Sequence, residues 1–179
     1  MADYHVEEYV REMNLAAVKL ARDLADEYTA KNPDKPRFVA GSVGPTNKTC
    51  SMSPDVNNPA YRALSYDELA ASYQQQMEAM LEGGVDAILI ETIFDTLNAK
   101  AAIFAAEQAM KMTGIEVPIM LSVTVSDIGG RTLSGQTLDA FLASVQHANI
   151  FSVGLNCSFG ARQLKPVPGT AGIPCTLLY

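Results

Sequence analysis

Residues 151–157 read Phe-Ser-Val-Gly-Leu-Asn-Cys. The run is apolar or small until its last two residues, which bring an amide and a thiol. A short apolar run of this kind is typical of a buried strand. The stretch therefore predicts a strand over residues 150–157 that presents Cys157 at an opening at its carboxyl end.

Three similar apolar runs precede this strand, and stretches with helical periodicity lie between them. The predicted strands cover residues 37–41, 86–91, 118–125 and 150–157, and the predicted helices cover residues 6–30, 66–82, 95–112 and 137–147. Strands that alternate with helices predict an α/β fold with parallel strands and right-handed crossovers. Because the strands are apolar nearly throughout, we expect burial on both faces of the sheet.

Two architectures fit this order, a doubly wound open sheet and a (β/α)8 barrel. No Gly-x-Gly-x-x-Gly follows any predicted strand, which weakens the dinucleotide-binding version of the open sheet. A whole barrel takes about 250 residues, and this chain has 179 residues and opens with a helix. The barrel reading therefore predicts a partial (β/α)8 barrel of about four parallel strands.

Composition narrows the classes of partner. The formal net charge is -7 and Lys+Arg total only 13, which argues against nucleic-acid or anionic-membrane binding. No apolar run approaches the roughly 20 residues of a membrane span, and the N-terminal residues lack a signal-peptide pattern. The three cysteines are odd in number and far apart. We therefore expect no disulfide framework, and we expect a cytoplasmic location.

Polar residues lie at the carboxyl end of each predicted strand, at the edge where parallel α/β folds build their sites. They are Ser42, Glu91-Thr92, Ser126-Asp127 and Asn156-Cys157. Residues 42–63 form a long loop at the same edge, and a loop of this length is more often functional than idle.

Glu91 closes an apolar run, so we expect it to be partly buried. A buried carboxylate needs a partner. The partner could be a substrate ammonium, a basic side chain of the protein or the N-terminus of the next helix.

Cys157 has three interpretations: a small packed residue, a nucleophile, or a metal ligand. Of the two histidines, His147 falls on a predicted helix and His5 immediately precedes one. Cys50 and Cys175 do not stand in a Cys-x-x-Cys spacing with it. Motif logic alone thus finds no complete zinc site.

The loop at residues 131–137 could bind an anionic substrate group through Arg131 or the following helix N-terminus. A turn followed by a helix N-cap is the favoured interpretation.

Five segments together carry a family resemblance. They are residues 38–47, 53–57, 90–102, 130–137 and 154–157, the last being Gly-Leu-Asn-Cys. In this order and spacing, residues 1–166 resemble the homocysteine S-methyltransferase family, and within it the homocysteine-binding domain of cobalamin-dependent methionine synthases.

The resemblance implies a (β/α)8 barrel in which Cys157 is the first of three cysteine ligands to zinc. Zinc holds the homocysteine sulfur as a thiolate, since coordination favours the ionised thiol. By the same resemblance Glu91 binds the homocysteine amino group, Thr124 and Asn156 belong to the substrate site, and no residue is assigned as catalytic. The methyl donor is methylcobalamin, remade from methyltetrahydrofolate on other domains of the full enzyme.

The departures from the family pattern predict a fragment. The Gly-Gly-Cys-Cys-Gly motif with the other two zinc cysteines is absent, as are the first two strands. Residues 167–179 diverge, which suggests an irregular tail or a reading-frame change, and Cys175 is no convincing substitute ligand. We therefore expect residues 1–166 to be the central part of the barrel, and the chain alone to be inactive. The alternatives are a betaine- or S-methylmethionine-dependent homocysteine methyltransferase, and a non-catalytic remnant that associates through open sheet edges.

Overall fold

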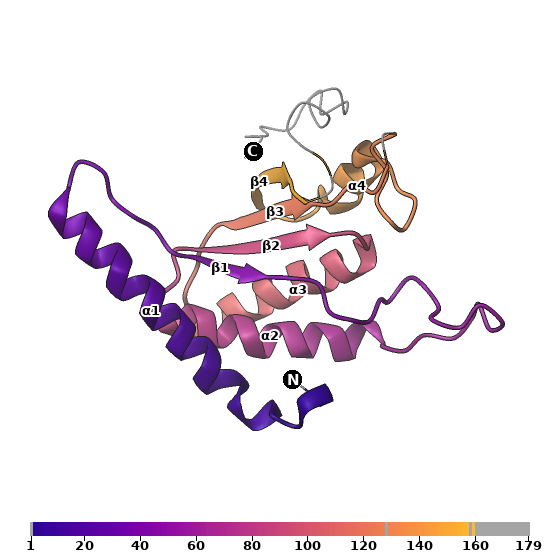
Figure 1. Ribbon diagram of the computed structural model, residues 1–179, viewed down its shortest axis with the longest axis horizontal. Coiled ribbons are helices and arrows are strands. Elements are labelled where there is room, and N and C mark those ends of the chain that lie inside the picture. Colours follow the sequence, from indigo (N-terminus) through magenta and orange to yellow (C-terminus); the bar gives the residue numbers. More distant parts are fainter. Residues whose placement is uncertain (1, 128, 158, 160–179) are drawn as a thin grey trace.

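Four parallel strands form one sheet, and helices connect them (Figure 1). The computed structural model describes residues 2–127, 129–157 and 159. The strands are β1 (Ala40–Val43), β2 (Ala87–Ile93), β3 (Ile119–Val123) and β4 (Ile150–Leu155). The helices are α1 (Val10–Lys31), α2 (Tyr66–Gly83), α3 (Thr96–Thr113) and α4 (Leu138–Val145), with 3-10 turns η1 (Ala2–Tyr4) and η2 (Glu7–Tyr9) before α1.

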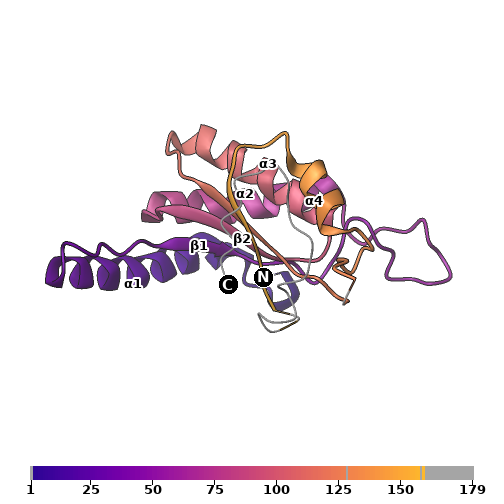
Figure 2. The same ribbon diagram turned by 90° about the horizontal axis from the view of Figure 1, so that it is seen from above.

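The order of strands across the sheet is β1-β2-β3-β4, the same as their order along the chain. A doubly wound sheet reverses its strand order at a switch point, and no reversal occurs in the described part of this chain. Figure 2 shows α2, α3 and α4 together on one side of the sheet. The winding is therefore that of consecutive barrel units, and the predicted partial (β/α)8 barrel is confirmed.

The two faces of the sheet differ in burial. Residues that face the helices are buried, among them Val43, Ile88 and Leu121. Leu89 and Met120, which alternate with them, are only half-buried. The prediction of burial on both faces is therefore wrong for the described residues. In a closed barrel this second face points inward, and side chains from all eight strands fill the interior.

Local signals explain where the helices begin. The predicted capping box opens α2: the Ser65 side chain accepts from the Glu68 N–H, and the Glu68 carboxylate accepts from the Ser65 N–H. The side chains of Asp95 and Thr137 cap α3 and α4 by accepting from backbone N–H groups of the first turn, without a reciprocal bond. Side-chain caps satisfy N–H groups that lack partners in the helix, so these boundaries agree with the prediction to within a residue or two.

Strand boundaries agree less well with the sequence. β1 begins at Ala40, because the Val39 N–H donates to Asp86 Oδ2 (2.7 Å) and Phe38 lies exposed. β2 continues two residues beyond Glu91, to Ile93. β4 ends at Leu155, so Cys157 follows the strand and is not part of it.

Helix α1 precedes the sheet and packs on α2 (Figure 1). The close approach is made at Gly83, where an added Cβ would lie 2.9 Å from Val18 Cβ. Arg22 of α1 also forms an ion pair with Asp86, which directly precedes β2 (2.6 Å).

The long loop after β1 is tied to the N-terminus of α3. The carboxylate of Asp95, which is buried, accepts from the Ser51 N–H (3.2 Å) and the Ser51 hydroxyl, while Asn98 Oδ1 accepts from the Cys50 N–H (2.8 Å). Tyr73 of α2 donates its hydroxyl to the Gly44 carbonyl (3.2 Å). These contacts fix both ends of residues 44–51 above the carboxyl ends of the strands.

In the described part of the chain, every helix is too short or too polar to cross a bilayer.

We predict that Gly83→Ala destabilises the chain by about 1–3 kcal/mol, because the new methyl group overpacks against Val18. Urea unfolding would measure the loss. Gly44→Ala is the matched control, since an added Cβ there meets no atom within 4 Å, and it should change stability little. Equal stability of the two variants would contradict the α1–α2 packing.

Tyr73 should make the fold sensitive to alkali. Burial raises the pKa of Tyr73 to about 12, against about 10 in an unfolded chain. The stability that the protonated Tyr73 hydroxyl contributes is therefore fully present below about pH 10 and is lost as the pH rises toward 12. Between pH 8 and 11 the wild type should lose about 1.4 kcal/mol more stability than Tyr73→Phe.

Urea unfolding at several pH values would check this difference. Tyr4→Phe, at an exposed tyrosine, is the control and should keep the wild-type alkaline loss. Parallel pH curves for Tyr73→Phe and the wild type would refute the assignment.

Candidate functional site

Polar side chains from β1, β2 and the residues just after β3 and β4 meet at the carboxyl edge of the sheet. This edge group consists of Ser42, Glu91, Thr92, Thr124, Asn156 and Cys157, and hydrogen bonds link its members. The parallel strands bring these residues together although they are far apart in sequence. The edge group contains all four residues that the sequence predicted for the site.

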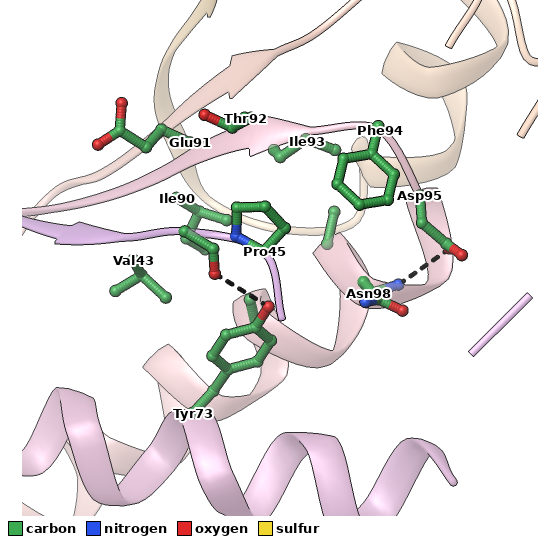
Figure 3. A pocket seen from close by; sticks show the side chains of 13 residues that line it. Val43, Pro45, Tyr73, Ile90, Glu91, Thr92, Ile93, Phe94, Asp95 and Asn98 are labelled. Carbon is green, nitrogen blue, oxygen red and sulfur yellow. Dashed lines mark hydrogen bonds between the residues drawn. The ribbon is translucent and has the colours of Figure 1, made fainter. Parts of the chain in front are cut away.

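A β-bulge in β2 shapes this edge. Ile90 pairs with Leu121 and Ile93 pairs with Val123, so three steps along β2 match two along β3. The extra residue lets Ile90 and Ile93 both face the helices, where both are buried. Glu91 and Thr92, the two residues between them, are both half-buried. Figure 3 shows both side chains on the side of β2 opposite Ile90. A bulge re-aims side chains in this way.

Glu91 is half-buried, as predicted, and accepts a hydrogen bond from the Ser42 hydroxyl through Oε1. No ion pair to Glu91 occurs within the described residues. A basic side chain of the protein is therefore not its partner in that part of the chain. The carboxylate can still accept a hydrogen bond from a cationic group, because each carboxylate oxygen can accept more than one hydrogen bond.

A chain of side-chain hydrogen bonds joins β2, β3 and β4. The Thr124 hydroxyl donates to Asn156 Oδ1 (2.7 Å), and Asn156 Nδ2 donates to Thr92 Oγ1 (2.9 Å). Backbone bonds hold the same residues in line, from Asn156 N to Val123 O (3.0 Å) and from Thr124 N to Ile93 O (2.8 Å). The amide of Asn156 thereby bridges the neighbouring strand ends.

Cys157 stands at the end of this chain of bonds. Its Sγ lies 3.9 Å from Thr92 Oγ1, the residue is exposed, and its φ of 67° is in the left-handed region. The packing interpretation of Cys157 therefore does not hold. An exposed thiol that is held by a neighbouring hydroxyl could act as one ligand of a soft metal ion.

The described residues do not complete a metal site. No group of three or more His, Cys, Asp or Glu side chains in that part of the chain could hold an ion, whereas zinc takes three or four protein ligands. Cys50 is buried in the long loop, where burial raises the pKa of its thiol. Cys175 and the rest of the predicted tail, residues 167–179, lie outside the described residues.

The loop at residues 131–137 is a turn that leads into a capped helix, as the favoured interpretation held. Arg131 Nη1 donates to the Gly135 carbonyl (3.1 Å), and Thr137 accepts from the Ala140 N–H.

Sequence reasoning missed Thr92 and Ser42 as members of the bonded network. Both residues lie at predicted strand ends, but no sequence pattern marks either one as part of a site. A strand that ends at Glu91 does not predict which way the Thr92 side chain points. The only available signal was the apolar Ile93 after Glu91-Thr92, which indicates that the strand continues past the two polar residues.

Comparison with known structures supports the same fold. The homocysteine methyltransferase MmuM from Escherichia coli, in its apo form, aligns with a TM-score of 0.67 at 22% sequence identity, over 88% of this chain and 52% of that one. Its metallated form aligns with a TM-score of 0.64 at 23% identity, over 82% of this chain and 49% of that one. The present chain thus spans about half the length of these relatives.

The homocysteine S-methyltransferase family model matches residues 1–175. The match covers nearly the whole sequence and includes every residue of the edge group. The chain therefore belongs to the homocysteine S-methyltransferase family.

Proposed function

We propose that this chain forms the homocysteine-binding part of an S-methyltransferase that makes methionine. The observation that carries the proposal is the edge group: Glu91 lies in β2 and Cys157 follows β4, yet both adjoin Thr92. A carboxylate and a thiol on one edge suit an amino acid that carries an ammonium group and a sulfur atom.

Glu91 is proposed to bind the ammonium group of homocysteine. The carboxylate is half-buried, bonded to the Ser42 hydroxyl and free of ion pairs within the described residues. Partial burial strengthens a charge-assisted hydrogen bond to an ammonium group. Thr124 and Asn156, which flank the same edge, would limit the position of the bound substrate.

Cys157 is proposed to supply one thiolate to a zinc ion, and the remaining ligands would come from outside the described residues. Zinc, when bound, supplies the charge that keeps a thiol ionised at neutral pH. The homocysteine sulfur then forms a bond to the methyl carbon, and the donor keeps the electron pair of the bond that breaks. Because the described residues provide a single cysteine at the edge, we expect other barrel segments to be needed for turnover.

The proposed methyl donor is methylcobalamin, as in methionine synthases. Support comes from the sequence, where the loop after Gly41 and residues 130–136 favour a cobalamin-dependent enzyme. No residue of this chain is assigned to cobalamin or folate, which we place on other domains. Residues 1–166 are proposed as the central part of the barrel, and the cytoplasm as its location.

The ammonium assignment predicts that Glu91→Gln weakens homocysteine binding about tenfold, which corresponds to about 1.4 kcal/mol. Isothermal calorimetry or an NMR titration of the 179-residue chain would measure it. The variant should bind 4-mercaptobutyrate, which has the thiol and carboxylate but no ammonium group, as the wild type does. An equal loss for both ligands would reject the ammonium role.

Glu116→Gln is the matched control, because Glu116 is an exposed carboxylate before the amino end of β3. It should leave both affinities unchanged.

Donor choice would be tested by offering methylcobalamin, S-methylmethionine and betaine with zinc and measuring methionine. Turnover by the 179-residue chain alone would contradict the expected need for other segments.

A further inference from the structure

Thr92 has a backbone conformation that its residue type disfavours. Its φ is 59°, in the left-handed region, where a β-branched residue is a genuine outlier. A turn alone would be made more easily by glycine, which adopts positive φ without a steric penalty. Such an outlier persists where its surroundings hold it, and it points to a role for the side chain.

The side chain of Thr92 contacts two residues after β4. Its Oγ1 accepts from Asn156 Nδ2 (2.9 Å), and the same oxygen lies 3.9 Å from Cys157 Sγ. The Asn156 amide is itself oriented, because its Oδ1 accepts from the Thr124 hydroxyl (2.7 Å). With one lone pair of Oγ1 occupied by the Asn156 amide, the hydroxyl proton remains free for the sulfur.

The bulge in β2 sets the direction in which the Thr92 side chain points. In a regular strand of the same sequence, Thr92 would share the face of Ile90 and point toward the helices, away from Asn156 and Cys157. The bulge and the positive φ together place the hydroxyl on the same face as Glu91.

We propose that Thr92 is the positioning residue of the site: its hydroxyl, oriented by Asn156, holds the sulfur of Cys157 in one rotamer beside Glu91. The link to methyl transfer rests on the proposed function, but the positioning itself does not. Partners of this kind orient the ligands of metal sites. Here the partner is already in place through the protein's own side chains.

The test is NMR on the 179-residue chain without added metal. In the wild type, the two Hα–Hβ couplings of Cys157 should be unequal, because one staggered rotamer is populated. Thr92→Val keeps the shape and removes the hydroxyl. It should average the two couplings and shift the side-chain amide signals of Asn156. Thr92→Ser keeps the hydroxyl and should retain the wild-type couplings.

Two further variants separate positioning from folding. Thr92→Gly suits the positive φ, so it should fold, yet it should lose the single Cys157 rotamer as Thr92→Val does. Thr113→Val is the matched control, since the Thr113 hydroxyl bonds only within α3 and to the turn after it, and it should change neither signal.

Unequal Cys157 couplings and an unshifted Asn156 amide in both Thr92→Val and Thr92→Gly would overturn the proposal. These signals do not depend on homocysteine. Failure of the Glu91→Gln binding test would therefore reject the proposed function and leave the positioning role of Thr92 intact. Failure of the NMR test would reject the positioning role and leave the proposed function intact.

Discussion

The bulge in β2 is the constraint on which the edge group depends. A regular strand would send Glu91 and Thr92 to opposite faces, so only one could reach the open edge. The extra residue turns both toward the same face and keeps Ile90 and Ile93 in the core. One irregular step therefore serves both the apolar layer beneath the sheet and the polar edge above it.

Around this step, the edge group is held by bonds between strands that are distant in sequence. Asn156 spans from β2 to the residue after β3, and Ser42 reaches Glu91 from β1. The helix layer stabilises the sheet from one side, while capped helix starts and the Asp95 anchor fix the loops at the same end. Rigid strands thus carry the functional groups, and the loops are tied to them.

Much of this could be predicted from the sequence because the signals are local. The Ser65–Glu68 capping box, the apolar runs and the glycine after α2 give the order of the elements and the start of α2, while the strand ends are less accurate. Partial burial of Glu91 followed from its place at the end of an apolar run. The bulge could not be predicted, because it depends on register against β3, which is a tertiary property. The uncovered sheet face was missed for a similar reason: apolar residues such as Leu89 and Met120 indicate burial, but not which segments provide it.

The bulge also has a consequence for how this segment can vary. Because the two polar residues share a face only through one surplus position, deleting a single residue between Ile90 and Ile93 would restore regular pleating and leave only one polar residue on that face. Residues 90–93 should therefore accept changes of side chain more readily than changes of length. Insertions and deletions in homologous genes should be rarer there than in residues 52–64, where no strand register has to be kept.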